Sequence, residues 1–114
     1  MEQPRTRTLY RAVRTDPPTD RDYVTLQERK GDPPDDLPED RRRSWNALSF
    51  YDTSAGVRRM AAEIRGLWRF VARYEIPLDV TDLAWEESIE PGHYDVRGNK
   101  ETLKRCLAND IEPI

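Results

Sequence analysis

The stretch from residue 44 to residue 77 constrains the fold more than any other part of the chain, because two different periodicities follow one another in it. Residues 48–51 are typical of a short strand, and the three residues after them can cap a helix. Apolar side chains then recur at helical spacing until Gly66, which favours a helix end. From residue 68 to residue 76 apolar and charged side chains alternate, as in a strand with one buried face. The sequence therefore predicts a strand–helix–strand unit with its helix over residues 54–65.

The segments on either side of this unit predict short elements of both kinds. Further strands are expected over residues 7–14, 83–89, 93–97 and 106–111, and further helices over residues 20–30, 36–45 and 100–105. The expected order is β-α-α-β-α-β-β-β-α-β, which favours helices packed on a mostly antiparallel sheet. We therefore predict one compact α+β domain over residues 1–114, with three or four short helices and a mobile proline-rich loop at about residues 31–38.

The composition predicts a folded cytoplasmic protein. Charged residues make up 36% of the chain, which alone would suggest disorder, but the apolar residues follow structural periods and include three tryptophans and five tyrosines. No apolar run could span a bilayer, and residues 1–5 contain no apolar signal region, so no membrane association is expected. The single cysteine, Cys106, is expected to be a small buried apolar residue of the last strand and cannot form an internal disulfide.

The net charge of −3 is unevenly distributed along the chain. Residues 41–73 carry eight arginines against two acidic residues, a balance of +6, whereas residues 1–40 and 74–114 carry −3 and −6. A basic middle could attract a polyanion or pair with the acidic ends. We favour the second, because nucleic-acid binders usually have a basic overall balance. Nucleic acid is therefore an unfavoured partner, and the arginines at 41–43 are expected on a solvated helix face.

The sequence lacks the common motifs of metal, phosphate and nucleophilic chemistry. One histidine and one cysteine on separate expected elements give no zinc-ligand spacing, so we predict no metal. The five glycines are scattered, which excludes a P-loop enzyme and a Rossmann dehydrogenase. His93 lies in a predicted turn and is expected to lie at the surface or to pair within that turn rather than to act in a catalytic triad.

A looser pattern of three parts remains. It joins two residues of the first strand, three hydroxyl-bearing residues on and after a middle strand, and a late acidic pair: Tyr10 and Arg11; Ser49, Tyr51 and Thr53; Glu86 and Glu87. This pattern resembles the small ADP-ribosyltransferase-like proteins, including the RES-domain toxins that degrade NAD. Their fold is a pair of packed sheets around a cleft for the dinucleotide, and they carry an arginine or histidine in the first strand and a late glutamate.

The resemblance implies a role in NAD chemistry for each part. Arg11 would hold the pyrophosphate, which suits a planar fork of donors, and Ser49 and Tyr51 would shape the nicotinamide-ribose pocket. Glu86 or Glu87 would hydrogen-bond a ribose hydroxyl and stabilise an oxocarbenium-like transition state. Tyr10 and Thr53 would be the remaining NAD-binding residues. The two glutamates are adjacent, so in a strand they point to opposite faces and only one can face a given cleft.

The same residues also have a purely structural interpretation. Arg11 could pair with Glu75 or with a late acidic residue, and Ser49 could face solvent. Tyr51 could be a core aromatic, Thr53 could cap a helix, and the glutamates could be solvated.

Three functions therefore stay open. The first is NAD hydrolysis or ADP-ribosyl transfer by a toxin- or effector-like protein, with NAD as substrate. The second is a non-catalytic accessory or partner-binding module of a toxin–antitoxin or phage-defence system. Such a module would use its arginine-rich middle to hold an acidic protein, for example a cognate antitoxin. The third and least favoured is a nucleic-acid binder.

Overall fold

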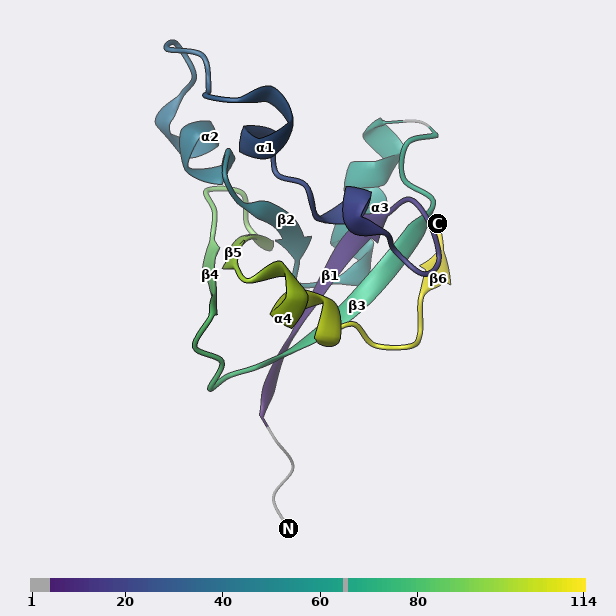
Figure 1. The fold of residues 1–114 in the computed structure, drawn as a ribbon. Coiled ribbons are helices and arrows are strands. Elements are labelled where there is room, and N and C mark those ends of the chain that lie inside the picture. Colours follow the sequence, from purple (N-terminus) through teal and green to yellow (C-terminus); the bar gives the residue numbers. More distant parts are fainter. Residues whose placement is uncertain (1–4, 65) are drawn as a thin grey trace.

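The computed structural model describes residues 5–64 and 66–114, and these residues form a single α+β domain (Figure 1). The strands in the described ranges are β1 (Thr6–Val13), β2 (Leu48–Tyr51), β3 (Phe70–Pro77), β4 (Leu83–Glu87), β5 (His93–Gly98) and β6 (Glu112–Pro113). The helices there are the 3-10 helix η1 (Asp20–Tyr23) and the α-helices α1 (Leu26–Lys30), α2 (Glu39–Ser44), α3 (Ser54–Glu63) and α4 (Lys100–Arg105). Apart from η1, this order is the one predicted from the sequence.

All six strands lie in one antiparallel sheet with the order β4-β5-β2-β1-β3-β6. The α+β class is thus confirmed, whereas nothing in this single sheet confirms the pair of packed sheets of the ADP-ribosyltransferase-like proteins. The central strand β1 pairs with β3 along its whole length, from Thr6↔Pro77 to Val13↔Phe70. β1 and β2, in contrast, share only one pair of opposed residues, Tyr10↔Tyr51. Beyond that pair β1 and β2 separate, and the candidate site lies in this split.

Both faces of the sheet are covered. In Figure 1 the helix α4 lies in front of the sheet and α3 lies behind it. Leu103 of α4 packs in the larger core with Leu9 of β1, whereas Val57 of α3 packs on the opposite face with Ala12 and Val71. The alternation predicted for residues 68–76 is confirmed from Ala72 to Ile76, where every second side chain is buried. It does not hold at Val71, which α3 buries on the second face.

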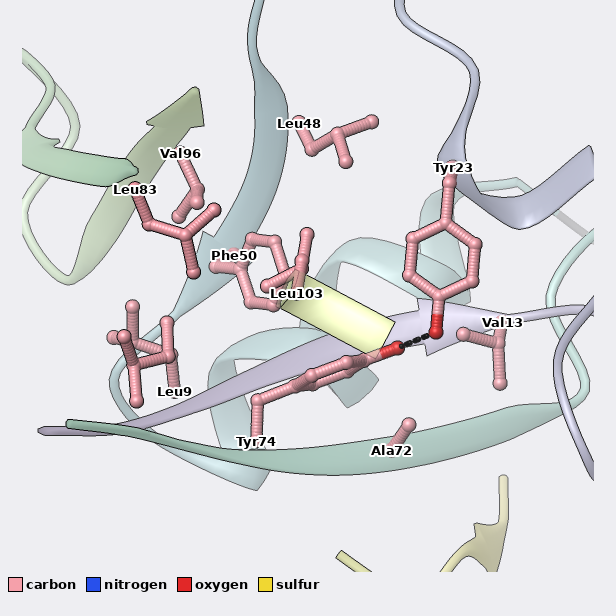
Figure 2. Packing of buried hydrophobic residues seen from close by; sticks show 11 residues of the cluster. Leu9, Val13, Tyr23, Leu48, Phe50, Ala72, Tyr74, Leu83, Val96 and Leu103 are labelled. Carbon is pink, nitrogen blue, oxygen red and sulfur yellow. Dashed lines mark hydrogen bonds between the residues drawn. The ribbon is translucent and has the colours of Figure 1, made fainter. Parts of the chain in front are cut away.

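Aromatic side chains occupy the centre of the larger core (Figure 2). The rings of Phe50 and Tyr74 meet edge to face, with centroids 5.1 Å apart. The hydroxyls of Tyr23 and Tyr74 lie 2.7 Å apart and form a buried hydrogen bond, drawn as the dashed line in Figure 2. Because a buried tyrosine hydroxyl needs a polar partner, this bond fixes η1 against the sheet.

The helix expected over residues 20–30 is two helices. Val24 and Thr25 have extended backbones between η1 and α1, so the chain changes direction there. Thr25 then caps α1: its side chain accepts a hydrogen bond from the backbone N–H of Glu28, and the Glu28 carboxylate accepts from Thr25. A complete capping box therefore begins a new helix inside the predicted one.

Two other predicted ends were wrong. The helix predicted over residues 54–65 ends at Glu63, and Ile64 is its exposed C-cap residue rather than part of the core. The last strand does not begin at Cys106, which is the half-buried C-cap residue of α4, and β6 is confined to Glu112–Pro113.

In the remaining segments, α2 begins after Pro38 rather than at Asp36, and residues 31–38 form the connection between α1 and α2. Within the described ranges, no helix has both the length and the apolarity needed to cross a membrane.

Candidate binding site in the split between β1 and β2

The split between β1 and β2 is bridged by the side chain of Arg11. Its Nε and Nη2 donate hydrogen bonds to the backbone carbonyl of Asp22, at 3.0 Å and 2.7 Å, and its Nη1 donates to the carbonyl of Ser49 at 2.7 Å. Arg11 is only 7% exposed, so the guanidinium takes the place of backbone pairing and connects η1 with β2. These bonds use three of its five N–H donors.

The charge of Arg11 is held mainly by carbonyl dipoles. Burial lowers the pKa of Arg11, and the ring of Phe50 lies 5.6 Å from its guanidinium carbon. The ion pair with Glu75 that the structural interpretation allowed is not formed, because Glu75 accepts hydrogen bonds from Thr8 and Arg73 instead. Arg11 is therefore part of the fold and also part of the wall of the hollow described next.

The hollow in the split has a volume of about 480 Å³ and is lined by four arginines and no acidic residue. We call it the arginine hollow; its charged and hydroxyl-bearing walls are Arg11, Arg14, Arg21, Arg29, Thr25, Ser44, Ser49 and Tyr51. Met60, Ile64 and Trp68, from α3 and the segment after it, add an apolar side. The hollow thus combines positive charge, the hydroxyls of Ser49 and Tyr51, and aromatic surface.

Among the arginines of the hollow that were not predicted as site residues, Arg14 has a buried N–H group without a partner in the described chain. Its guanidinium carbon lies 5.4 Å from the centre of the Trp68 ring. Its Nε is buried and has no hydrogen-bond partner among the described residues. Stacking on an indole with an N–H unused leaves this side chain suited to an anionic ligand.

The other two arginines of the hollow carried a weak sequence signal. Arg21, Thr25 and Arg29 are spaced by four residues, which would place them along one side of a helix. In the structure the chain breaks between η1 and α1, but all three residues still face the same hollow.

Two of the predicted hydroxyl-bearing residues line the hollow and one does not. Ser49 and Tyr51 lie in its wall. Burial raises the pKa of Tyr51 to about 12, so its hydroxyl stays protonated at neutral pH and can donate a hydrogen bond. Thr53 is the N-cap residue of α3 and accepts a hydrogen bond from the backbone N–H of Gly56 at 3.0 Å. Tyr10, which pairs with Tyr51, packs in the core under α3 and is not among the lining residues.

Glu86 and Glu87 lie elsewhere, on the edge strand β4. They line a second hollow of about 570 Å³, which we call the acidic hollow; its walls are Glu39, Asp40, Arg43, Glu86, Glu87, Ser88, Ile89 and Asp95. Glu86 pairs with Arg97 at 2.9 Å, and Glu87 accepts a hydrogen bond from the backbone N–H of Gly92. The structure therefore brings Arg11 together with Ser49 and Tyr51 but places both glutamates in a different hollow. The expectation that only one of the two glutamates can face a given cleft was wrong, because both line the acidic hollow at the end of β4.

Comparison of the chain with protein-family models, with curated proteins and with solved structures found no match. In the described part of the chain, no group of three or more histidine, cysteine, aspartate or glutamate side chains is arranged to hold a metal ion. His93 is buried, and its Nδ1 lies 2.7 Å from the Ser88 hydroxyl of the same turn. The two charged hollows are therefore the candidate sites for a function.

Proposed function

We propose that this protein is a non-catalytic partner-binding module that holds an anionic group of another protein in the arginine hollow. The observation that carries the proposal is a hollow lined by four arginines with no acidic side chain. A guanidinium presents a planar fork of donors that matches a carboxylate, and several of them around one hollow attract acidic residues. An acidic protein, such as the cognate antitoxin considered from the sequence, is the kind of partner that fits.

NAD chemistry takes second place because of where the acidic residues lie. Hydrolysis of a glycosidic bond needs a carboxylate beside the reacting carbon to stabilise an oxocarbenium-like transition state. The arginine hollow offers arginines for a pyrophosphate but no carboxylate, and Glu86 and Glu87 line the acidic hollow. A binding function requires nothing beyond the side chains already in the arginine hollow.

The test is a titration of a fluorescein-labelled, glutamate-rich peptide with the full-length protein, followed by fluorescence anisotropy. Arg14→Gln is expected to weaken binding roughly 10- to 150-fold, since a hydrogen bond to a charged group contributes about 1.5–3 kcal/mol. Arg105→Gln is the matched control, because Arg105 is exposed on α4 and lies outside the hollow. Its affinity should equal that of the unchanged protein, and added salt should weaken binding to both.

Two results would overturn the proposal. One is an Arg14→Gln variant that binds the acidic peptide as tightly as the Arg105→Gln control. The other is release of nicotinamide when the purified protein is incubated with NAD, provided that Glu86→Gln or Glu87→Gln abolishes the release. That result would replace the binding function by the NAD reaction.

A further inference from the structure

A third hollow lies between the two charged ones. It has a volume of about 490 Å³, and we call it the middle hollow; its walls are Leu26, Leu37, Asp40, Arg41, Ser44, Trp45, Ser88, Ile89, Glu90 and His93. It shares Leu26 and Ser44 with the arginine hollow, and it shares Asp40, Ser88 and Ile89 with the acidic hollow. The three hollows therefore adjoin in the order arginine, middle, acidic beside α2, and we call this row of hollows the groove.

The middle of this groove presents apolar side chains at the surface. Ile89 is 79% exposed in the turn between β4 and β5, and Leu37 and Trp45 are half-buried around it. The Trp45 indole donates to the carbonyl of Gly31 at 2.7 Å, so its ring is held in place. Exposed apolar side chains rimmed by charge are typical of protein interaction surfaces.

The acidic end of the groove contains a buried carboxylate oxygen without a donor. Asp95 is only 2% exposed, and its Oδ2 accepts a hydrogen bond from the Ser44 hydroxyl at 2.9 Å. Its Oδ1 is buried and has no partner among the described residues, although Asp95 lines the acidic hollow. Burying a carboxylate oxygen without a donor is costly, so this position favours a ligand that brings N–H groups.

Among the described residues, none supplies a cation to Asp95. Arg43 is the one basic residue in the wall of the acidic hollow, and its side chain is 70% exposed and pairs with Glu39 at 3.8 Å. Four further carboxylates surround the hollow, and the described residues offer no group arranged for a metal ion. The guanidinium or ammonium group of an arginine or lysine side chain therefore matches the chemistry of this hollow.

We propose that the groove binds one extended segment of the partner protein, with an acidic residue in the arginine hollow, apolar residues in the middle hollow and an arginine or lysine against Asp95. This inference rests on the proposed function, and it adds the order of acidic, apolar and basic residues in the ligand. A protein segment fits better than a nucleic acid, because a polyanion attracted to one end of the groove is repelled at the other.

The sheet brings the two charged hollows close together. Ser49, in the wall of the arginine hollow, is paired across β2 and β5 with Asp95, in the wall of the acidic hollow, so the two side chains lie on the same face of the sheet. A short extended segment, which advances about 3.3 Å per residue, can therefore reach both hollows.

The experiment compares two labelled peptides with the same acidic and apolar residues. The first carries a lysine at the basic position, and the second carries norleucine there, which keeps the apolar stem and removes the charge. Each is titrated against the full chain and against the Asp95→Asn variant, whose amide oxygen can still accept from Ser44. Asp79→Asn is the matched control, since Asp79 is exposed in the turn after β3 and lines none of the three hollows.

Asp95→Asn is expected to weaken the lysine peptide about tenfold and to leave the norleucine peptide unchanged, as a double-mutant cycle requires for a direct pair. If Asp95→Asn proves unable to fold, Asp40→Asn, at the junction of the middle and acidic hollows, should give a smaller loss that again depends on the lysine.

The possible failures are distinguishable. Equal effects of Asp95→Asn on both peptides would overturn the inference while leaving the proposed function intact, provided that Arg14→Gln still weakens both. Loss of the Arg14→Gln effect would overturn the proposed function itself. Displacement of the lysine peptide by a single-stranded oligonucleotide, with a steep salt dependence, would replace the protein ligand by a nucleic acid.

Discussion

The hydrogen bond between Tyr23 and Tyr74 gives a quantitative prediction about the core. Both rings are buried, and the hydroxyl oxygens are 2.7 Å apart. Changing either residue to phenylalanine removes one hydroxyl and leaves the other buried without its partner, which costs about 1–3 kcal/mol. For 114 residues, the typical unfolding entropy of about 2.1 cal/mol/K per residue converts this loss into a fall in Tm of about 4–12 °C.

The double variant, Tyr23→Phe with Tyr74→Phe, tests the reasoning more sharply. It removes both hydroxyls and leaves no unsatisfied group, so it should be no less stable than either single variant. Urea unfolding followed by circular dichroism should give a coupling energy of about 1–2 kcal/mol in the double-mutant cycle, with unchanged m-values. Tyr94→Phe is the control and should change the free energy of unfolding by less than about 0.5 kcal/mol. Losses that simply add in the double variant would refute the argument, because they would show that the two hydroxyls act independently.

Two further predictions concern the backbone and the pH dependence of stability. Gly98→Ala should lower the free energy of unfolding by about 3 kcal/mol or more, because Gly98 has φ +129° and a Cβ there would lie 2.1 Å from the carbonyl oxygen of Asp82. Gly66→Ala should lower it by only about 1–2 kcal/mol, because Gly66 has φ +77° and open space around it. Equal urea midpoints for the two variants would contradict this prediction. Burial raises the pKa of Tyr51 from 10.0 to about 12, so its contribution to stability is complete below pH 10 and is lost as the pH rises from 10 to 12. The free energy of unfolding, measured across that interval, should therefore fall less in Tyr51→Phe, and identical slopes would show that Tyr51 is not the group involved.

The elements that the sequence predicted correctly have local causes. The N-cap of α3 at Thr53 and the N-cap of α4 at Asn99 each depend on a side chain that accepts from backbone N–H groups two or three residues later. The turn at Gly92 depends on one residue with φ +81°. In each case the residues that interact lie within a few positions of one another, so they can be recognised from the local sequence alone.

The site depends on distant partners, and these could not be derived from local patterns. Arg11 meets the carbonyls of Asp22 and Ser49 only because β1 and β2 separate after one pair, which no periodicity encodes. The glutamates of β4 belong to a different hollow because β5 and β2 lie between β4 and β1 in the sheet. Strand order and the point at which two strands diverge are tertiary properties, and they decide which charged residues share a hollow.

The single backbone pair between β1 and β2 also has a dynamic consequence. It divides the sheet into two three-stranded halves, β4-β5-β2 and β1-β3-β6, that meet along a seam at Tyr10 and Tyr51. Opening this seam breaks fewer backbone hydrogen bonds between strands than opening the β1–β3 ladder, so the two halves are expected to separate at the seam before β1 and β3 do. The arginine hollow has walls on β1 and the acidic hollow has walls on β4 and β5, so a segment bound as proposed would contact both halves and slow amide hydrogen exchange in both.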